Sequence, residues 1–174
     1  MSTRLTSVLI ANRGEIAIRI ARAAAEQGLR TVTVYSEDDA AALHTKKSDE
    51  TRALRGTGPA AYLDAGQIVA AARASGCDTI HPGYGFLSEQ AAFARRCAAA
   101  DLVFVGPAPK VLDVLGDKPR ARALAERAGV PVLAGTTGPT SLDEARAFLG
   151  AQGTGAGIMI KAIAGGGGRG MRAV

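Results

Sequence analysis

Three helix-compatible stretches of this chain end in a glycine that is followed within a few residues by a short apolar run. The apolar runs read TVTV, CDTI and VPVL, and the glycines before them are Gly28, Gly76 and Gly129. Glycine readily adopts the left-handed conformation that closes a helix. A recurring order of helix, glycine and strand is typical of α/β folds, in which helices connect parallel strands.

Most of this alternation lies in the first 106 residues. The apolar run at 7–11 stops at Asn12-Arg13-Gly14, and helix-compatible residues follow at 15–27. We expect further strands at 31–35, 50–54, 77–80 and 102–105, and helices at 62–74 and 88–99. The sequence therefore predicts an α/β fold with a doubly wound, Rossmann-like, mostly parallel sheet over residues 1–106, whose ligand crevice lies at the carboxyl ends of the strands.

The character of the sequence changes at Pro107. Two helical stretches separated by Gly-Asp-Lys-Pro predict a helical connector over 107–131. We expect a strand at 130–133, a helix at 141–149, a strand at 158–162 and a last strand after the four glycines at 165–168. Nothing follows the last strand that could pair with it, so we interpret 132–174 as the start of an incomplete second domain.

Composition argues against several classes of function. The chain has 21 Lys and Arg against 16 Asp and Glu, a net charge of +5, but only 4% aromatic residues for stacking on bases. No apolar run approaches the roughly 18 residues that a membrane helix needs. Cys77 and Cys97 are too few for a disulfide scaffold. We predict a cytoplasmic protein with two buried thiols that binds neither nucleic acid nor membrane.

The four consecutive glycines are the sharpest motif. Backbone N–H groups of residues without a Cβ atom can approach a polyphosphate closely, and Lys161 and Arg169 supply positive charge on either side. Lys118, in Gly-Asp-Lys-Pro, is a second lysine suited to phosphate. No Gly-Lys-Ser/Thr triplet occurs, which excludes a Walker loop. On spacing alone, a flexible linker and solvated surface lysines remain alternatives.

The segment from Gly83 to Ser88, GYGFLS, lies between a predicted strand and a predicted helix, as a dinucleotide fingerprint would. Serine replaces the third glycine, so a nicotinamide-binding domain is a weak alternative. His81 and Cys77 are spaced as two metal ligands could be, but the chain offers few other soft ligands, which argues against zinc.

The first predicted helix carries a polar stripe of Glu15, Arg19, Arg22 and Glu26 at spacings of four, three and four. This spacing predicts two ion pairs along the helix. The stripe is either a solvated face or a two-fold subunit contact, because its charges are self-complementary. The alternative to an enzyme is thus a stand-alone, non-catalytic α/β module for dimerisation or nucleotide binding.

Five segments, in order from Val8 to Val174, together resemble the amino-terminal part of biotin carboxylase. They read VLIANRGEIAIRI, TIHPGYGFLSEQ, FVGP, LGDK and IMIKAIAGGGGRGMR. Biotin carboxylases are ATP-grasp ligases of biotin-dependent carboxylases, such as acetyl-CoA, propionyl-CoA, other acyl-CoA and pyruvate carboxylases. The resemblance implies an enzyme that uses MgATP to activate bicarbonate as carboxyphosphate and then carboxylates biotin on a carrier domain.

The resemblance also implies roles for individual residues. Lys118 and Lys161 would bind the ATP phosphates through their side chains, and Gly167 and Gly168 through their backbone. Tyr84, Gly85 and Glu89 would lie beside the biotin pocket. The expected partners are a biotin carboxyl carrier domain, a carboxyltransferase component and a second copy bound through Arg19, Arg22 and Glu26.

Two departures from the family pattern matter. Ile163 and Ala164 stand where many relatives have a serine and a further glycine. The residues that such enzymes use for magnesium, bicarbonate and general base catalysis would all lie beyond residue 174. We therefore expect no catalytic residue and no metal ligand in this chain, which by itself should be inactive and retain none of ATP, Mg²⁺, biotin or bicarbonate.

Overall fold

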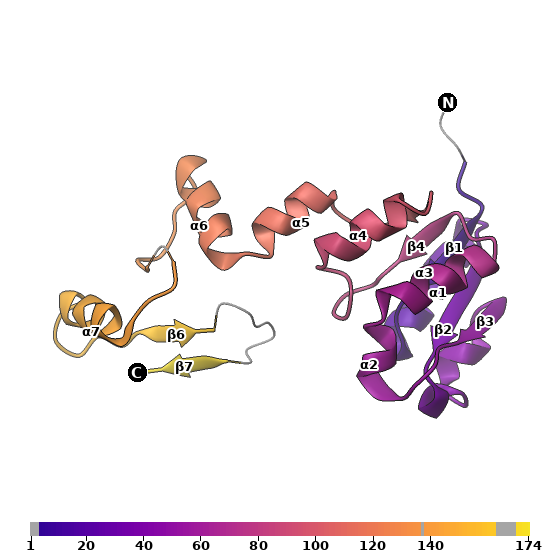
Figure 1. The fold of residues 1–174 in the computed structure, drawn as a ribbon, viewed down its shortest axis with the longest axis horizontal. Helices are drawn as coiled ribbons and strands as arrows, with labels where there is room; N and C mark the ends of the chain where they lie inside the picture. Colours follow the sequence, from indigo (N-terminus) through magenta and orange to yellow (C-terminus); the bar gives the residue numbers. More distant parts are fainter. Residues whose placement is uncertain (1–3, 137, 163–169) are drawn as a thin grey trace. The chain divides into compact units, whose positions relative to one another are not determined.

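The computed structural model describes residues 4–136, 138–162 and 170–174 (Figure 1). It divides into two compact units, Met1–Asp113 and Val114–Val174, which are described separately. No described helix is long and apolar enough to cross a membrane.

The first unit is built on a five-stranded sheet in the order β3-β2-β1-β4-β5. Every neighbouring pair in this sheet is parallel. This order, with the first strand in the middle, confirms the predicted doubly wound sheet. The strands are β1 (Ser7–Ile10), β2 (Arg30–Tyr35), β3 (Glu50–Ala53), β4 (Thr79–His81) and β5 (Val103–Phe104).

Helices cover both faces of this sheet. On one face, Val8 and Ile10 of β1 pack against Ala17, Ile20 and neighbouring alanines of the first helix. On the other face, Leu9, Val32 and Ile80 belong to a larger core with side chains from the third and fourth helices. Strands covered on both sides are continuously apolar, as in the run at 7–11. The helices are α1 (Gly14–Glu26), α2 (Gly58–Tyr62), α3 (Ala65–Ala74), α4 (Ala91–Ala98) and α5 (Pro109–Leu115), and two 3-10 turns, η1 (Glu37–Asp39) and η2 (Leu43–Lys46), lie between β2 and β3.

The helix predicted at 62–74 begins at Ala65 in the structure, as α3, and its first predicted residue, Tyr62, ends the preceding helix α2. Asp64 lies between them, and its carboxylate accepts hydrogen bonds from the N–H groups of Gly66 and Gln67. An Asp in this position caps the amino terminus of a helix and favours a new start over a continuation. The break places Tyr62 at the end of α2, where it contributes to the site described below.

The second unit contains α6 (Lys118–Arg127), α7 (Leu142–Ala151) and an antiparallel pair, β6 (Met159–Lys161) and β7 (Met171–Ala173). Asp117 caps α6, and a reciprocal capping box of Ser141 and Glu144 starts α7. The last strand thus pairs with the strand before it. Met159, Ile160 and Met171 of this hairpin are exposed.

The strand predicted at 130–133 was wrong, because these residues join no ladder in the described structure. The N–H of Val130 instead bonds to the carbonyl of Ala125 and completes the end of α6. Pro131 has no N–H to offer to a neighbouring strand. An apolar, β-branched composition was therefore outweighed by local hydrogen bonding.

Candidate functional site

The loop between β4 and α4, residues 82–90, carries three of the residues expected at the site. Tyr84, Gly85 and Glu89 are all exposed. Gly83, Gly85 and Phe86 have positive φ angles of 67°, 71° and 42°. Such backbone is unfavourable for a residue with a side chain, so Phe86 adopts it only because neighbouring contacts hold it. The loop lies at the carboxyl end of β4, next to the end of β1, where a doubly wound sheet forms its ligand crevice.

Asn12 joins this loop to the end of β1. Its side chain is fully buried, and its amide nitrogen donates to the carbonyls of Pro82, at 2.7 Å, and Tyr84, at 3.0 Å. Its amide oxygen accepts the N–H of Arg13 at 2.9 Å. Both N–H donors of the side chain are thus used on the loop, which matches the requirement that buried polar groups be paired.

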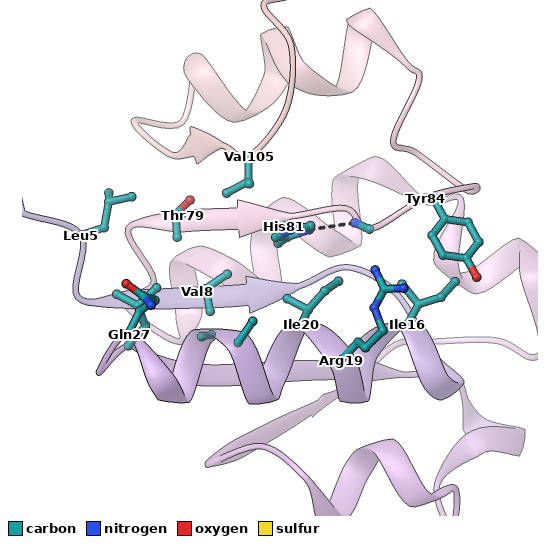
Figure 2. Close-up of a pocket in the computed structure, with 14 residues that line it drawn as sticks. Leu5, Val8, Ile16, Arg19, Ile20, Gln27, Thr79, His81, Tyr84 and Val105 are labelled. Carbon is teal, nitrogen blue, oxygen red and sulfur yellow. Dashed lines mark hydrogen bonds between the residues drawn. The ribbon is translucent and has the colours of Figure 1, made fainter.

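Gly83 fits against the same asparagine. A Cβ atom at this position would lie 2.7 Å from both Asn12 Nδ2 and Ile16 Cγ2. The N–H of Gly83 donates to Nδ1 of His81 at 3.0 Å (Figure 2). Burial lowers the pKa of His81 below its ordinary value, which keeps the ring neutral and this nitrogen able to accept.

Tyr84 connects the loop to α1. Its hydroxyl donates to Oε1 of Glu15 at 2.7 Å, and this bond to a carboxylate raises the pKa of the phenol. The two ion pairs predicted along α1 were wrong: within the described structure no salt bridge joins Glu15 to Arg19 or Arg22 to Glu26. The tyrosine takes Glu15 instead, and exposed i,i+4 pairs are too weak to prevent it.

A second set of contacts holds the loop at Phe86. The ring of Phe86 stacks on Tyr62, and the Tyr62 hydroxyl donates to Asp39 at 2.7 Å. Arg13 donates to both oxygens of Asp39, each at 2.5 Å. The Arg13 guanidinium is the main cause that lowers the pKa of Asp39 to about 2. Because Arg13 follows Asn12 in the chain, these contacts connect back to the asparagine that holds the start of the loop.

An open pocket of about 440 Å³ lies beside this loop on the α1 face of the sheet. Its lining is mainly apolar and includes Val8, Ile16 and Ile20. Figure 2 shows Arg19 and Tyr84 at one end of the pocket and Leu5 and Gln27 at the other. Tyr84 therefore belongs to the loop and also borders the apolar surface of α1.

The residues expected to bind phosphate lie in the second unit. Lys118 is the first residue of α6, and Lys161 is the last residue of β6; both are exposed. Gly167 and Gly168, together with Ile163 and Ala164, lie outside the described residues. The amino terminus of a helix attracts anions, so the position of Lys118 combines a cation with the positive end of α6.

Three residues that matter at the loop were missed at the level of sequence: Asn12, Asp39 and Tyr62. The position of Asn12 was a usable signal, because a polar residue directly after a buried parallel strand lies at the ligand crevice.

Cys77 and Cys97 are both buried and free, as predicted. Among the described residues, no three His, Cys, Asp or Glu side chains group together as a metal site.

Two family descriptions match the chain. "Biotin carboxylase, N-terminal domain" matches residues 4–112, and "Carbamoyl-phosphate synthase L chain, ATP binding domain" matches residues 117–174. Pyruvate carboxylase from Schizosaccharomyces pombe is 48% identical over 179 residues, which cover 100% of this chain and 15% of that protein. The chain thus spans less than a sixth of that relative's length.

Two solved structures are similar along nearly the whole chain. A biotin carboxylase from Campylobacter jejuni in complex with β,γ-ATP has a TM-score of 0.92 and 40% identity, covering 98% of this chain and 38% of that one. The biotin carboxylase domain dimer of Hydrogenobacter thermophilus 2-oxoglutarate carboxylase, with MgADP, ADP and bicarbonate, has a TM-score of 0.88 and 42% identity, covering 97% and 37%.

Proposed function

The chain belongs to the family of biotin carboxylase N-terminal domains, and from that premise we propose that it supplies the amino-terminal domain and the start of the ATP-grasp domain of a biotin carboxylase. The whole enzyme uses MgATP and bicarbonate to carboxylate biotin on a carrier domain. The observation that carries this proposal is the order of the two family matches, 4–112 and then 117–174, within one chain. Within this scheme, residues 1–106 form the α/β domain, 107–131 the connector and 132–174 the start of the ATP-grasp domain.

On the nucleotide side, we assign Lys118, Lys161 and the backbone of Gly167 and Gly168 to the ATP phosphates. Transfer of a phosphoryl group requires positioning and charge neutralisation more than covalent participation by the protein. Two exposed lysines, one of them at a helix amino terminus, support this assignment. The nucleotide complexes of the Campylobacter and Hydrogenobacter proteins favour the same class of substrate here.

On the biotin side, we assign Tyr84, Gly85 and Glu89 to the wall of the biotin pocket. All three are exposed on one loop at the carboxyl edge of the sheet. The loop is held at two places, by the hydrogen bonds of Asn12 and by the stack of Phe86 on Tyr62. A substrate pocket benefits from such a rigid wall, because less freedom is lost when the substrate binds.

Magnesium does not fit the described residues, since no three His, Cys, Asp or Glu side chains among them group together in a way that could hold a metal ion. We therefore assign no metal-dependent step to this chain. The magnesium ligands, the bicarbonate site and the general base belong to the remainder of the carboxylase in this scheme. The exposed apolar residues of the β6–β7 hairpin support a role for that remainder in covering the hairpin.

The proposed partners are a biotin carboxyl carrier domain, a carboxyltransferase component and a second copy of the chain. For the second copy, we assign the contact to Arg19, Arg22 and Glu26. These side chains are exposed and make no salt bridge with one another in the described structure. The Hydrogenobacter relative is a dimer, which supports the same kind of assembly here.

The test joins residues 1–174 to the carboxyl-terminal remainder of the Campylobacter biotin carboxylase, and this fusion is called the completed carboxylase. We expect it to transfer labelled bicarbonate to biotin only when ATP is present, and the 174-residue chain alone to transfer none. A matched fusion with the equivalent Hydrogenobacter segment controls for the junction. If that control is active and the folded completed carboxylase is not, the proposed function is wrong.

A further inference from the structure

We propose that Asn12 is a positioning residue for biotin carboxylation, because it fixes the peptide groups of the loop that faces biotin. This inference rests on the proposed function. It concerns a residue that touches no substrate in the scheme above, since its side chain is fully buried behind the loop.

Asn12 sets the direction of the peptide bond between Tyr84 and Gly85. The Tyr84 carbonyl accepts a hydrogen bond from Asn12 Nδ2 at 3.0 Å. In a planar trans peptide, the carbonyl and the following N–H point in opposite directions. The N–H of Gly85 therefore points away from Asn12, and among the described residues it donates to no other group. Gly85 is an exposed residue, so its unused N–H is available to an acceptor, such as the ureido oxygen of biotin.

The backbone of the loop needs such a restraint. Gly83, Gly85 and Phe86 all have positive φ angles, so the loop occupies backbone conformations that are easily left when its contacts are removed. Asn12 holds two alternate carbonyls at once, those of Pro82 and Tyr84. Loss of both bonds would allow the Tyr84–Gly85 peptide to rotate, and the Gly85 N–H would lose its direction.

Asn12 differs from the other contacts of the loop in the groups that it holds. The stack of Phe86 on Tyr62 and the bond from Tyr84 to Glu15 hold side chains, whereas Asn12 holds the backbone itself. Tyr62 and Glu15 can thus keep the loop near the sheet without fixing its peptide planes. Among the described residues, Asn12 is the one whose side chain donates to carbonyls of the loop.

The experiment compares Asn12→Ser and Asn12→Asp in the completed carboxylase. Serine is too short to reach both carbonyls, and aspartate keeps the size of asparagine but places a carboxylate oxygen against them. We expect kcat/KM for biotin to fall at least about tenfold. The KM for ATP and the rate of ATP cleavage without biotin should stay within about twofold, because the ATP residues lie on other elements.

Asp78→Asn is the matched control. Asp78 accepts three hydrogen bonds from Thr6 and Ser7 at the opposite, amino-terminal edge of the sheet. The Asp78→Asn substitution should lower the free energy of unfolding, but it should not change the kinetic constants for biotin more than those for ATP. An Asn12 variant that behaves in the same way, or that leaves biotin kinetics unchanged, overturns the proposal.

Folding of the variants and the amide resonance of Gly85 are measured as well. If Asn12→Asp does not fold, Asn12→Ser decides, and the amide shift of Gly85 in the folded 174-residue chain must move in that variant; an unmoved shift overturns the proposal. Failure of the proposed function itself is recognised separately, because the completed carboxylase with native Asn12 would then transfer no label to biotin.

Discussion

The rings of Tyr62 and Phe86 are stacked, with centroids 5.2 Å apart and planes 20° apart. This contact joins the end of α2 to a loop whose backbone is otherwise unfavourable at Phe86. Tyr62 also donates to Asp39, which Arg13 holds from the other side. One tyrosine therefore links the strained loop to an ion pair whose carboxylate is buried and whose guanidinium is about half exposed, at 47%.

We predict that Tyr62→Phe keeps the stack but lowers the free energy of unfolding by about 1–3 kcal/mol, because Asp39 loses a donor at a buried position. Denaturant unfolding monitored by circular dichroism measures this change. Tyr35→Phe is the control, since the Tyr35 hydroxyl makes no hydrogen bond within the described structure. Equal effects of the two substitutions would contradict the role given to the Tyr62 hydroxyl.

Gly83 tests how closely the loop packs on α1. Gly83→Ala places a Cβ atom 2.7 Å from Asn12 and Ile16 at a positive φ. Gly76→Ala is matched, because Gly76 has a φ of 60° with nothing within 4 Å of a new Cβ. We expect about 1–2 kcal/mol of destabilisation from backbone strain at Gly76, and a further 1–3 kcal/mol, roughly, at Gly83 from overpacking. Unfolding free energies that agree for the two variants would show that the close approach is absent.

His81 should make the loop sensitive to pH. Burial lowers its pKa below the ordinary value of about 6.5. The stabilisation from neutral His81 is therefore complete above pH of about 6.5 and is lost as the pH falls through the lower pKa of the folded state. Protonation of Nδ1 removes the acceptor for the Gly83 N–H, so we expect the Gly83 amide shift to titrate with a midpoint below 6.5. The same shift should stay flat in His81→Gln, and a midpoint above 6.5 would contradict the account.

The polar stripe on α1 predicts the oligomeric state. If Arg22 meets Glu26 of a second copy across a two-fold axis, Arg22→Glu places like charges together and should weaken the dimer at least about tenfold. Arg73→Glu, a reversal on an exposed residue of α3, is the control. Light scattering of the completed carboxylase over a range of concentrations measures the change. A dimer that withstands Arg22→Glu would assign the stripe to solvent.

The order of strands and helices in the first unit could be predicted because it depends on local patterns. The pattern of a helix-closing glycine followed by an apolar run identified β2 and β4, and the strands predicted at 7–11, 50–54 and 102–105 correspond to β1, β3 and β5. Local patterns failed where a hydrogen bond competed, as at Val130, whose N–H completes α6. They also failed along α1, where Tyr84, distant in sequence, took the carboxylate of Glu15.

The candidate site depends more strongly on contacts that are distant in sequence. Asn12 is 70 residues from Pro82, and Arg13 is 26 residues from Asp39. No spacing rule reaches across such distances. From spacing alone, the GYGFLS segment could be interpreted as a dinucleotide fingerprint. Its proposed place beside biotin came from the resemblance, and the contacts that hold it became visible only in the fold.

The most direct measurement of the central claim compares Lys161→Ala with Tyr84→Ala in the completed carboxylase. The claim is that one chain contributes to two substrate sites, ATP through its second unit and biotin through its first. We predict that Lys161→Ala raises the KM for ATP about tenfold and leaves the KM for biotin within about twofold, and that Tyr84→Ala does the reverse. Lys110→Ala, at an exposed residue of α5, should change neither. Substitutions that affect both substrates equally would contradict the assignment of two sites to this chain.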